Sequence, residues 1–125
     1  MVLLIIGCTS TLRFQVIDSG SGKPIPGAKV NWSGATVWFS EHLRSWNAMV
    51  DYSTDSNGVV IIRDVDLKRD RNSFRFSKNG YDDALVLPLA HINTVDVISY
   101  RNGAPITTNV ATLRNTITVP LHKNP

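Results

Sequence analysis

The stretch LRFQVIDSGSGKPIPGAKVNW, residues 12–32, decides the fold. Apolar and polar residues alternate along its first part, and this alternation predicts a strand from Thr11 to Ile17 with one buried face. Residues 18–27 are rich in Gly, Pro, Ser and Asp, which favour a tight turn. The alternation returns at Ala28, Val30 and Trp32 and predicts a second strand. Strands joined by a turn, with no helix between them, indicate a β-protein.

Short strands and turns continue through the rest of the chain. Further strands are predicted at residues 36–40, 59–62, 74–76, 84–89, 95–100 and 117–121. Ser33-Gly34 is expected to end the second strand. Asn57-Gly58 and Asn102-Gly103 are typical of hairpins, because Asn-Gly accepts the positive φ angles of a type I′ turn. Pro120 cannot donate a ladder hydrogen bond, so it predicts an edge strand.

One segment departs from this pattern. Residues 41–50 contain no Gly or Pro and are predicted to form one or two helical turns, as an insertion between strands. Elsewhere the short strands are spaced by turns, without a long amphipathic helix. The sequence therefore predicts an all-β fold, an antiparallel β-sandwich of about seven strands with a short helical or irregular insertion.

Length and composition restrict the function further. At 125 residues the chain fits one domain that can bury a proper core. One cysteine cannot form an internal disulfide or a cysteine-based zinc site. The formal net charge of +3 is mild, and the most basic stretch, residues 63–78, interleaves Lys and Arg with Asp. Because mixed signs weaken a single-sign field, we expect no nucleic acid partner. No cofactor is expected either.

The N-terminus begins with an apolar run, Val2 to Ile6, followed by Gly7 and the only cysteine, Cys8. This segment resembles the lipobox of bacterial lipoproteins, although no Lys or Arg precedes the run and the run is short for a signal core. The resemblance implies that residues 1–7 are a shortened signal peptide, that Cys8 is lipidated and that residues 8–11 are a tether. Residues 12–125 would then be the single domain. The alternative is an N-terminal strand with a buried structural Cys8.

Four sequence blocks resemble the carboxypeptidase regulatory-like domain. They occur in the family's order, at residues 14–18, 22–30, 54–60 and 78–81. The resemblance implies a transthyretin-like sandwich. The blocks themselves have structural reasons, since Pro24 and Pro26 stiffen a turn, Gly27 permits a bend and Ala28 leaves room for close packing. They therefore predict the fold more than a chemistry.

The aromatic residues concentrate in a segment that departs from the family pattern, and this segment contains every Trp of the chain. Exposed rings there would stack on a sugar or anchor a protein partner. The alternative is that these rings pack the segment onto the sandwich. The candidate binding surface consists of Trp32, Trp38, Phe39, Trp46 and Tyr52.

A weak calcium candidate overlaps the turn at Asn57-Gly58. Its oxygen ligands would come from Asp51, Asp55, Asn57 and Asp64. The same residues are explained by a turn, since Asp and Asn side chains accept hydrogen bonds from nearby backbone amides. No other metal site is expected.

Catalytic motifs are absent from the sequence. The three histidines, His42, His91 and His122, do not occur in a His-x-x-Glu or His-x-x-x-His arrangement. Hydroxyisourate hydrolase, a transthyretin-related enzyme, ends in Tyr-Arg-Gly-Ser, which residues 100–103 resemble only in part and at an internal position. A small hydrolase would need at least a His, an Arg and a Ser gathered in one cleft.

These observations lead to a ranked expectation. The leading hypothesis is a non-enzymatic domain of the bacterial cell envelope, anchored in the membrane through lipidated Cys8 and bound to another envelope protein. Thr9, in place of the Asp that retains many lipoproteins at the inner membrane, favours the periplasmic side of the outer membrane in a Gram-negative source. The alternatives are a carbohydrate-binding module that uses the tryptophans and a small transthyretin-related hydrolase. The sequence leaves the oligomeric state open.

Overall fold

The computed structural model describes residues 10–37, 45–65, 72–89, 94–110 and 116–125. These residues form strands and turns and include no helix, which confirms the predicted all-β fold. The strands are β1 (Ser10–Asp18), β2 (Lys29–Val37), β3 (Ser45–Ser53), β4 (Val59–Val65), β5 (Ser73–Ser77), β6 (Ala84–Leu89), β7 (Thr94–Arg101), β8 (Ala104–Val110) and β9 (Ile117–Leu121).

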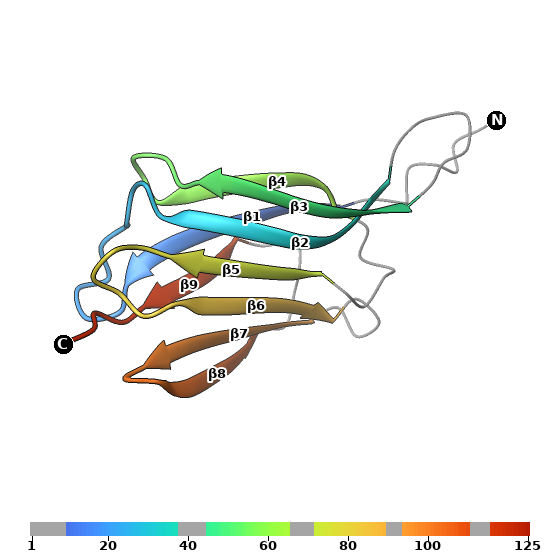
Figure 1. Cartoon of the computed structure of the whole chain (residues 1–125). Helices are drawn as coiled ribbons and strands as arrows, with labels where there is room; N and C mark the ends of the chain where they lie inside the picture. Colours follow the sequence, from blue (N-terminus) through green and yellow to red (C-terminus); the bar gives the residue numbers. More distant parts are fainter. Residues whose placement is uncertain (1–9, 38–44, 66–71, 90–93, 111–115) are drawn as a thin grey trace.

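The strands form a sandwich of two unequal layers (Figure 1). The larger layer has the order β3-β2-β5-β6-β7-β8, and the smaller has the order β4-β1-β9. Among the described residues, backbone pairing between the two layers occurs where β2 meets β4, at the pair Thr36 and Val65. All pairings are antiparallel except that of β1 with β9, which is parallel and departs from the purely antiparallel expectation. Strand β9 ends the smaller layer, so the edge position predicted from Pro120 is confirmed.

The core fills the space between the layers with every second side chain of the facing strands. Phe14 from the smaller layer contacts Phe74 and Phe76 from the larger one, with ring centroids 5.0 and 5.2 Å apart. All three rings are fully buried. Ala28, also fully buried, lies immediately before β2. The alternation read from residues 12–32 therefore identified core positions correctly.

Two predictions in the region of β2 and β3 are wrong. Gly34 does not end the second strand, because β2 continues to Val37. The glycine serves a close approach instead, since a Cβ there would lie 2.8 Å from the Cα of Asn72 and overlap its side-chain oxygen. Residues 45–50 are not helical. They pair with β2 in continuous antiparallel register, and this ladder outweighs their local helix propensity. Residues 38–44 lie outside the described part.

The structure confirms one of the two predicted Asn-Gly hairpins and not the other. Asn102 and Gly103 both have positive φ, 53° and 82°, and join β7 to β8 as the predicted type I′ hairpin. At the other turn Gly58 has φ 73° whereas Asn57 is not in the left-handed region. This turn joins β3 to β4, which belong to different layers, so the hairpin prediction there is wrong. A tight connection between layers and a hairpin use the same turn residues.

Strand β4 contains a bulge near its end. The register with β1 shifts between Ser10 and Leu12, and Asp64 has φ 60°. Arg63 and Asp64 are consecutive exposed residues, after which Val65 is buried again. Because of this extra residue, the side chain of Val65 points into the core at the point where β4 meets β2.

Candidate functional site

Three segments distant in sequence meet at one end of the sandwich, and we call this region the Asp18 end. They are the turn after β1, the β5–β6 loop and the C-terminal segment. The amide of Ser19 donates to the carbonyl of Leu121 at 2.9 Å, and that of Asp82 donates to the carbonyl of His122 at 2.8 Å. Tyr81 also forms an isolated bridge with Lys123. Backbone hydrogen bonds therefore hold the C-terminal segment against both loops.

Asp18 is the centre of this end. Its Oδ1 accepts hydrogen bonds from the amides of Gly20 and Ser21, at 2.8 and 3.0 Å. Its Oδ2 accepts the hydroxyl hydrogen of Tyr81 at 2.8 Å and lies 3.7 Å from Nζ of Lys123. The Tyr81 hydroxyl, followed by the backbone amides, lowers the pKa of Asp18 from 3.8 to about 2. The same hydrogen bond raises the pKa of Tyr81. The carboxylate is ionised at neutral pH and links three segments.

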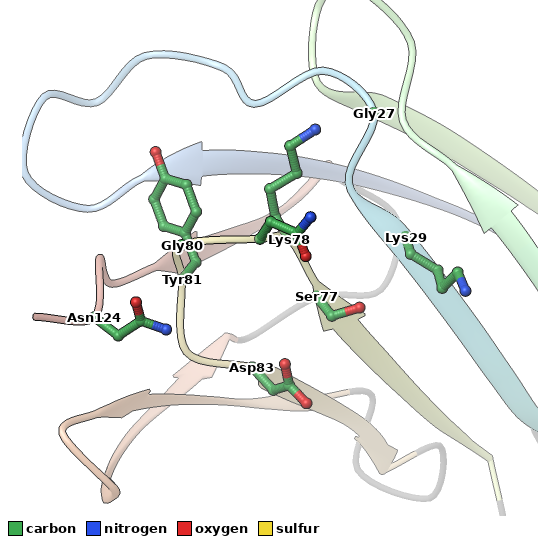
Figure 2. Close-up of a pocket in the computed structure, with 9 residues that line it drawn as sticks. Gly27, Lys29, Ser77, Lys78, Gly80, Tyr81, Asp83 and Asn124 are labelled. Atoms are coloured by element: carbon green, nitrogen blue, oxygen red, sulfur yellow. The ribbon is translucent and has the colours of Figure 1, made fainter.

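One pocket lies beside Tyr81, between the β5–β6 loop, β2 and the C-terminal segment (Figure 2). Its volume is about 460 Å³. Lys29 and Lys78 supply positive charge, and Asp83 supplies a carboxylate that pairs with Arg75 at 3.7 Å. Within the described residues neither lysine forms an ion pair. The lining is polar and suits a polar ligand, but it presents no nucleophile paired with a base.

A second pocket, of about 340 Å³, adjoins Asp18. Ser19, Arg101 and His122 line it, so a Ser, an Arg and a His do gather at one place. The Ser19 hydroxyl lies 2.8 Å from Nδ1 of His122. Sequence reasoning missed this pair because its members are 103 residues apart and have no motif around them. The sequence signal was limited to position, since His122 directly follows one predicted strand and Ser19 lies two residues after another.

The pair lacks the other parts of a hydrolytic site. Both oxygens of Asp18 are engaged elsewhere, so no described carboxylate orients the imidazole. The nearby amides of Ser19, Gly20 and Ser21 already donate to Leu121 or Asp18 and are not free to stabilise an oxyanion. The geometry therefore shows a hydrogen bond between exposed side chains and not a Ser-His-Asp triad.

The structure describes only part of the predicted aromatic surface. Trp32 is 3% exposed, donates from Nε1 to Oδ1 of Asn72 at 3.1 Å and stacks on Phe74 with a centroid distance of 6.1 Å. The exposed-surface hypothesis is therefore wrong for Trp32, and the alternative of packing onto the sandwich holds, because its position in β2 points it into the core. Tyr52 is half-buried and packs against the core, and burial raises its pKa. Trp38, Phe39 and the side chain of Trp46 lie outside the described residues.

The calcium candidate does not assemble. The carboxylate of Asp51 accepts a hydrogen bond from Asn31 at 2.8 Å. Asp55 instead accepts hydrogen bonds from the amides of Asn57 and Val59, at 2.8 and 3.0 Å, which lowers its pKa. The described residues contain no group of three or more His, Cys, Asp or Glu that could hold a metal ion. Asp51, Asp55, Asn57 and Asp64 therefore serve strand pairing, a turn and a bulge.

Cys8 lies outside the described residues, so the structure does not test its lipidation. Among the residues that the structure describes, no helix is long and apolar enough to cross a membrane.

Comparison with known proteins gives a fold and not a family. No protein-family model matches the chain, and no curated protein matches it. Among solved structures, a streptococcal ancillary pilin is 10% identical, with a TM-score of 0.50 over 94% of this chain and 30% of the pilin. The C-terminal domain of the shaft pilin SpaA from Lactobacillus rhamnosus GG is also 10% identical, with a TM-score of 0.50 over 93% of this chain and 98% of that domain.

A double mutant of the SpaA shaft pilin, also from Lactobacillus rhamnosus GG, has a TM-score of 0.51 at 10% identity, over 94% of this chain and 47% of the pilin. The chain thus spans under a third of the ancillary pilin and about half of that shaft pilin, but nearly all of the separate C-terminal domain. At this identity the likeness shows a shared β-sandwich fold.

Proposed function

We propose that the chain is a non-enzymatic structural domain of a bacterial cell-surface or envelope protein. The observation that carries this proposal is the coverage of the match. The sandwich corresponds to one whole domain of a shaft pilin, since 93% of this chain aligns with 98% of that domain. That domain is one part of a longer shaft pilin, since this chain covers 47% of the SpaA chain. A structural role of this kind requires no catalytic residues.

The chemistry of the Asp18 end supports the same proposal. Its carboxylate is held by the Tyr81 hydroxyl, Lys123 and backbone amides, and the C-terminal segment is tied down by backbone bonds. Such groups fix a shape instead of changing during a reaction. Mechanical or thermal unfolding tests this role. Replacing Tyr81 should make the domain unfold more easily, and the folded native chain should show no hydrolytic activity.

We also propose that Cys8 anchors the domain in the membrane of the bacterial envelope. The support is the Ile5-Ile6-Gly7-Cys8 sequence and the single occurrence of cysteine in the chain. The test is fractionation of bacteria that express the full chain, together with the intact mass of the product. The native chain should enter the membrane fraction as an acylated product that begins at Cys8, and Cys8→Ser should not. An uncleaved, unacylated chain in both cases would rule out the anchor.

The proposed binding partner concerns three aromatic residues, Trp38, Phe39 and Trp46. We propose that these rings contact another envelope protein, or a glycan. Tryptophan fluorescence against a glycan panel tests the sugar arm. Quenching or a spectral shift should disappear in Trp38→Ala or Trp46→Ala while the melting temperature stays constant. Trp32→Phe is the matched control, since Trp32 is buried and its loss should lower stability without removing binding.

Hydrolysis is the second candidate function, because Ser19, Arg101 and His122 line one pocket. The test is turnover of activated esters by the native chain, by Ser19→Ala and by His122→Gln. Activity that vanishes in both variants, while the melting temperature of each stays near the native value, would favour the hydrolase. Equal background rates in all three proteins would support the structural role.

A further inference from the structure

Strand β8 is exposed along its whole length up to Val110, on both faces of the sheet. It ends the larger layer, and the smaller layer has only β4, β1 and β9 to face the six strands of the larger one. Figure 1 shows the β7–β8 hairpin at the lower margin of the sandwich, away from β4 and β1. Within the described chain no strand pairs with the outer edge of β8.

The hairpin geometry identifies the backbone groups on that edge. Arg101 and Ala104 flank a two-residue type I′ turn and therefore exchange hydrogen bonds with each other. Bonded and non-bonded pairs alternate from there, so the amides of Thr107 and Asn109 point outward, away from β7. Pro105, which has no amide hydrogen, falls on an outward position, as the alternation requires. The Tyr100 amide, opposite it, donates to Asp83 and not to β8.

The other free edges of the sandwich each carry a feature that β8 lacks. Strand β3 carries Asp51, and β4 carries Arg63 and Asp64 in its bulge. Charges and bulges are the usual devices that prevent edge pairing. On β9, which contains Pro120, the carbonyl of that residue accepts a hydrogen bond from the hydroxyl of Ser99 at 2.8 Å. Strand β8 reads Ala-Pro-Ile-Thr-Thr-Asn-Val and carries no charged residue.

We infer that β8 is a self-association edge, on which a second copy of this chain adds its own β8 in antiparallel orientation. A second copy fits because the edge is complementary to itself when the two-fold axis passes through Thr107. The two Thr107 residues then exchange amide-to-carbonyl hydrogen bonds. Each Asn109 amide donates to the carbonyl of the partner's Pro105, so the missing amide hydrogen of Pro105 is tolerated.

Side chains agree with this register. Ile106 is 44% exposed and lies on the inward side of the sheet, opposite Ser99. In the paired edge it comes to lie opposite the partner's Thr108, in a close non-hydrogen-bonded pair that covers part of its apolar surface. Because β8 contains no charged residue, the paired strands place no like charges opposite each other, although each copy carries a net charge of +3. An edge contact alone is small, so we expect weak, concentration-dependent association.

The test uses the full chain with Cys8→Ser, which removes acylation and disulfide exchange and so separates this inference from the lipid anchor. Sedimentation equilibrium should show a mass that rises from monomer toward dimer with concentration. Amide hydrogen exchange should slow with concentration at Thr107 and Asn109, and should not change at Thr108 and Val110, which already bond to β7. If exchange at Thr107 and Asn109 does not slow with concentration, or if the mass stays monomeric at every concentration, the inference is overturned.

Variants at the two-fold axis sharpen the test. Thr107→Pro deletes the central amide donor, and Thr107→Lys places like charges face to face. Each should weaken association by about tenfold or more. Thr107→Ser keeps the amide and the neutral charge and should associate as the parent does. Because Thr107→Lys does not alter the backbone, it remains informative if Thr107→Pro fails to fold. Association unchanged in Thr107→Lys overturns the proposed edge and points to another surface.

Discussion

The Asp18 end and the outer edge of β8 treat their polar groups in opposite ways. At the Asp18 end the carboxylate oxygens accept from the Gly20 and Ser21 amides and the Tyr81 hydroxyl, and the C-terminal segment is bonded to two loops. On β8 the outward amides and carbonyls have no partner among the described residues, and the side chains around them are exposed. One region closes the sandwich and the other leaves it open.

This difference separates residues that stabilise the domain from residues that are free to associate. A group that already has its hydrogen-bond partners gains little from a new contact, and removing it leaves those partners unsatisfied. A backbone edge in water loses little when a side chain on it changes, but it gains new bonds when a strand is added. Substitutions at the Asp18 end should therefore change stability, and substitutions on β8 should change association.

The largest effect is expected for Asp18→Asn. The amide side chain removes the negative charge that Tyr81 and Lys123 face, and it places an NH₂ donor where an acceptor is needed. The melting temperature should fall several times further than for Asp83→Asn, the matched control, whose carboxylate forms only an exposed ion pair with Arg75. Equal melting temperatures for the two variants would show that the Asp18 end does not stabilise the fold.

Acid should reproduce much of this loss. The pKa of Asp18 is about 2 in the folded protein, below its ordinary value of 3.8, so its ionised form stabilises the fold. That contribution is present above pH 3.8 and is lost as the pH falls toward 2. Melting curves from pH 5 downward should therefore drop more steeply for the native chain than for Asp18→Asn. Parallel curves for the two proteins would contradict the assignment.

A smaller loss is expected for Tyr81→Phe, which keeps the ring and removes only the hydroxyl donor to Asp18. Deleting one hydrogen bond of this kind should lower the free energy of unfolding by about 1 kcal/mol. Chemical denaturation measures it. Tyr100→Phe serves as a control, because the Tyr100 hydroxyl forms no hydrogen bond with any other described residue. A double variant, Asp18→Asn with Tyr81→Phe, should lose less than the sum of the two single losses.

The smallest effect on stability is expected for Ile106→Thr on β8. The side chain is already 44% exposed, so the free energy of unfolding of the monomer should change by no more than about 0.5 kcal/mol. Val97→Thr on the neighbouring strand makes a comparable change at a 2% exposed position and should lose about 1–3 kcal/mol. Chemical denaturation at low protein concentration compares the two. A similar loss at both positions would mean that β8 belongs to the core as much as β7 does.

The alternation of side chains was enough to predict most of the fold. Phe14, Val30, Phe74 and Val119 are buried where the period of two placed them, because successive side chains of a strand point to opposite faces. The Asn102-Gly103 hairpin followed from local backbone preference in the same way. Prediction failed at residues 45–50, where pairing with β2 outweighed helix propensity, and at Asn57-Gly58, where the turn joins two layers.

The candidate site was less predictable than the fold. Trp32 was assigned to a binding surface by its neighbours in sequence, but its place on β2 makes it a core residue bonded to Asn72. Ser19 and His122 were not connected at all, since only the parallel pairing of β1 with β9 brings their positions together. A pattern of residue types carries no information on which distant segments become neighbours.

The sequence by itself determined that this protein is a β-sandwich and identified most of the side chains that fill its core, because strand periodicity and turn chemistry act over a few residues. Only the tertiary structure decided that hydrogen bonds tie down the Asp18 end, whereas the outer edge of β8 has no partner strand among the described residues. That outcome depends on the order of strands across two unequal layers and on the contacts between Asp18, Tyr81 and the C-terminal segment. Hydrogen bonds between segments far apart in the chain have no local signature, so they become visible only when the layers are assembled.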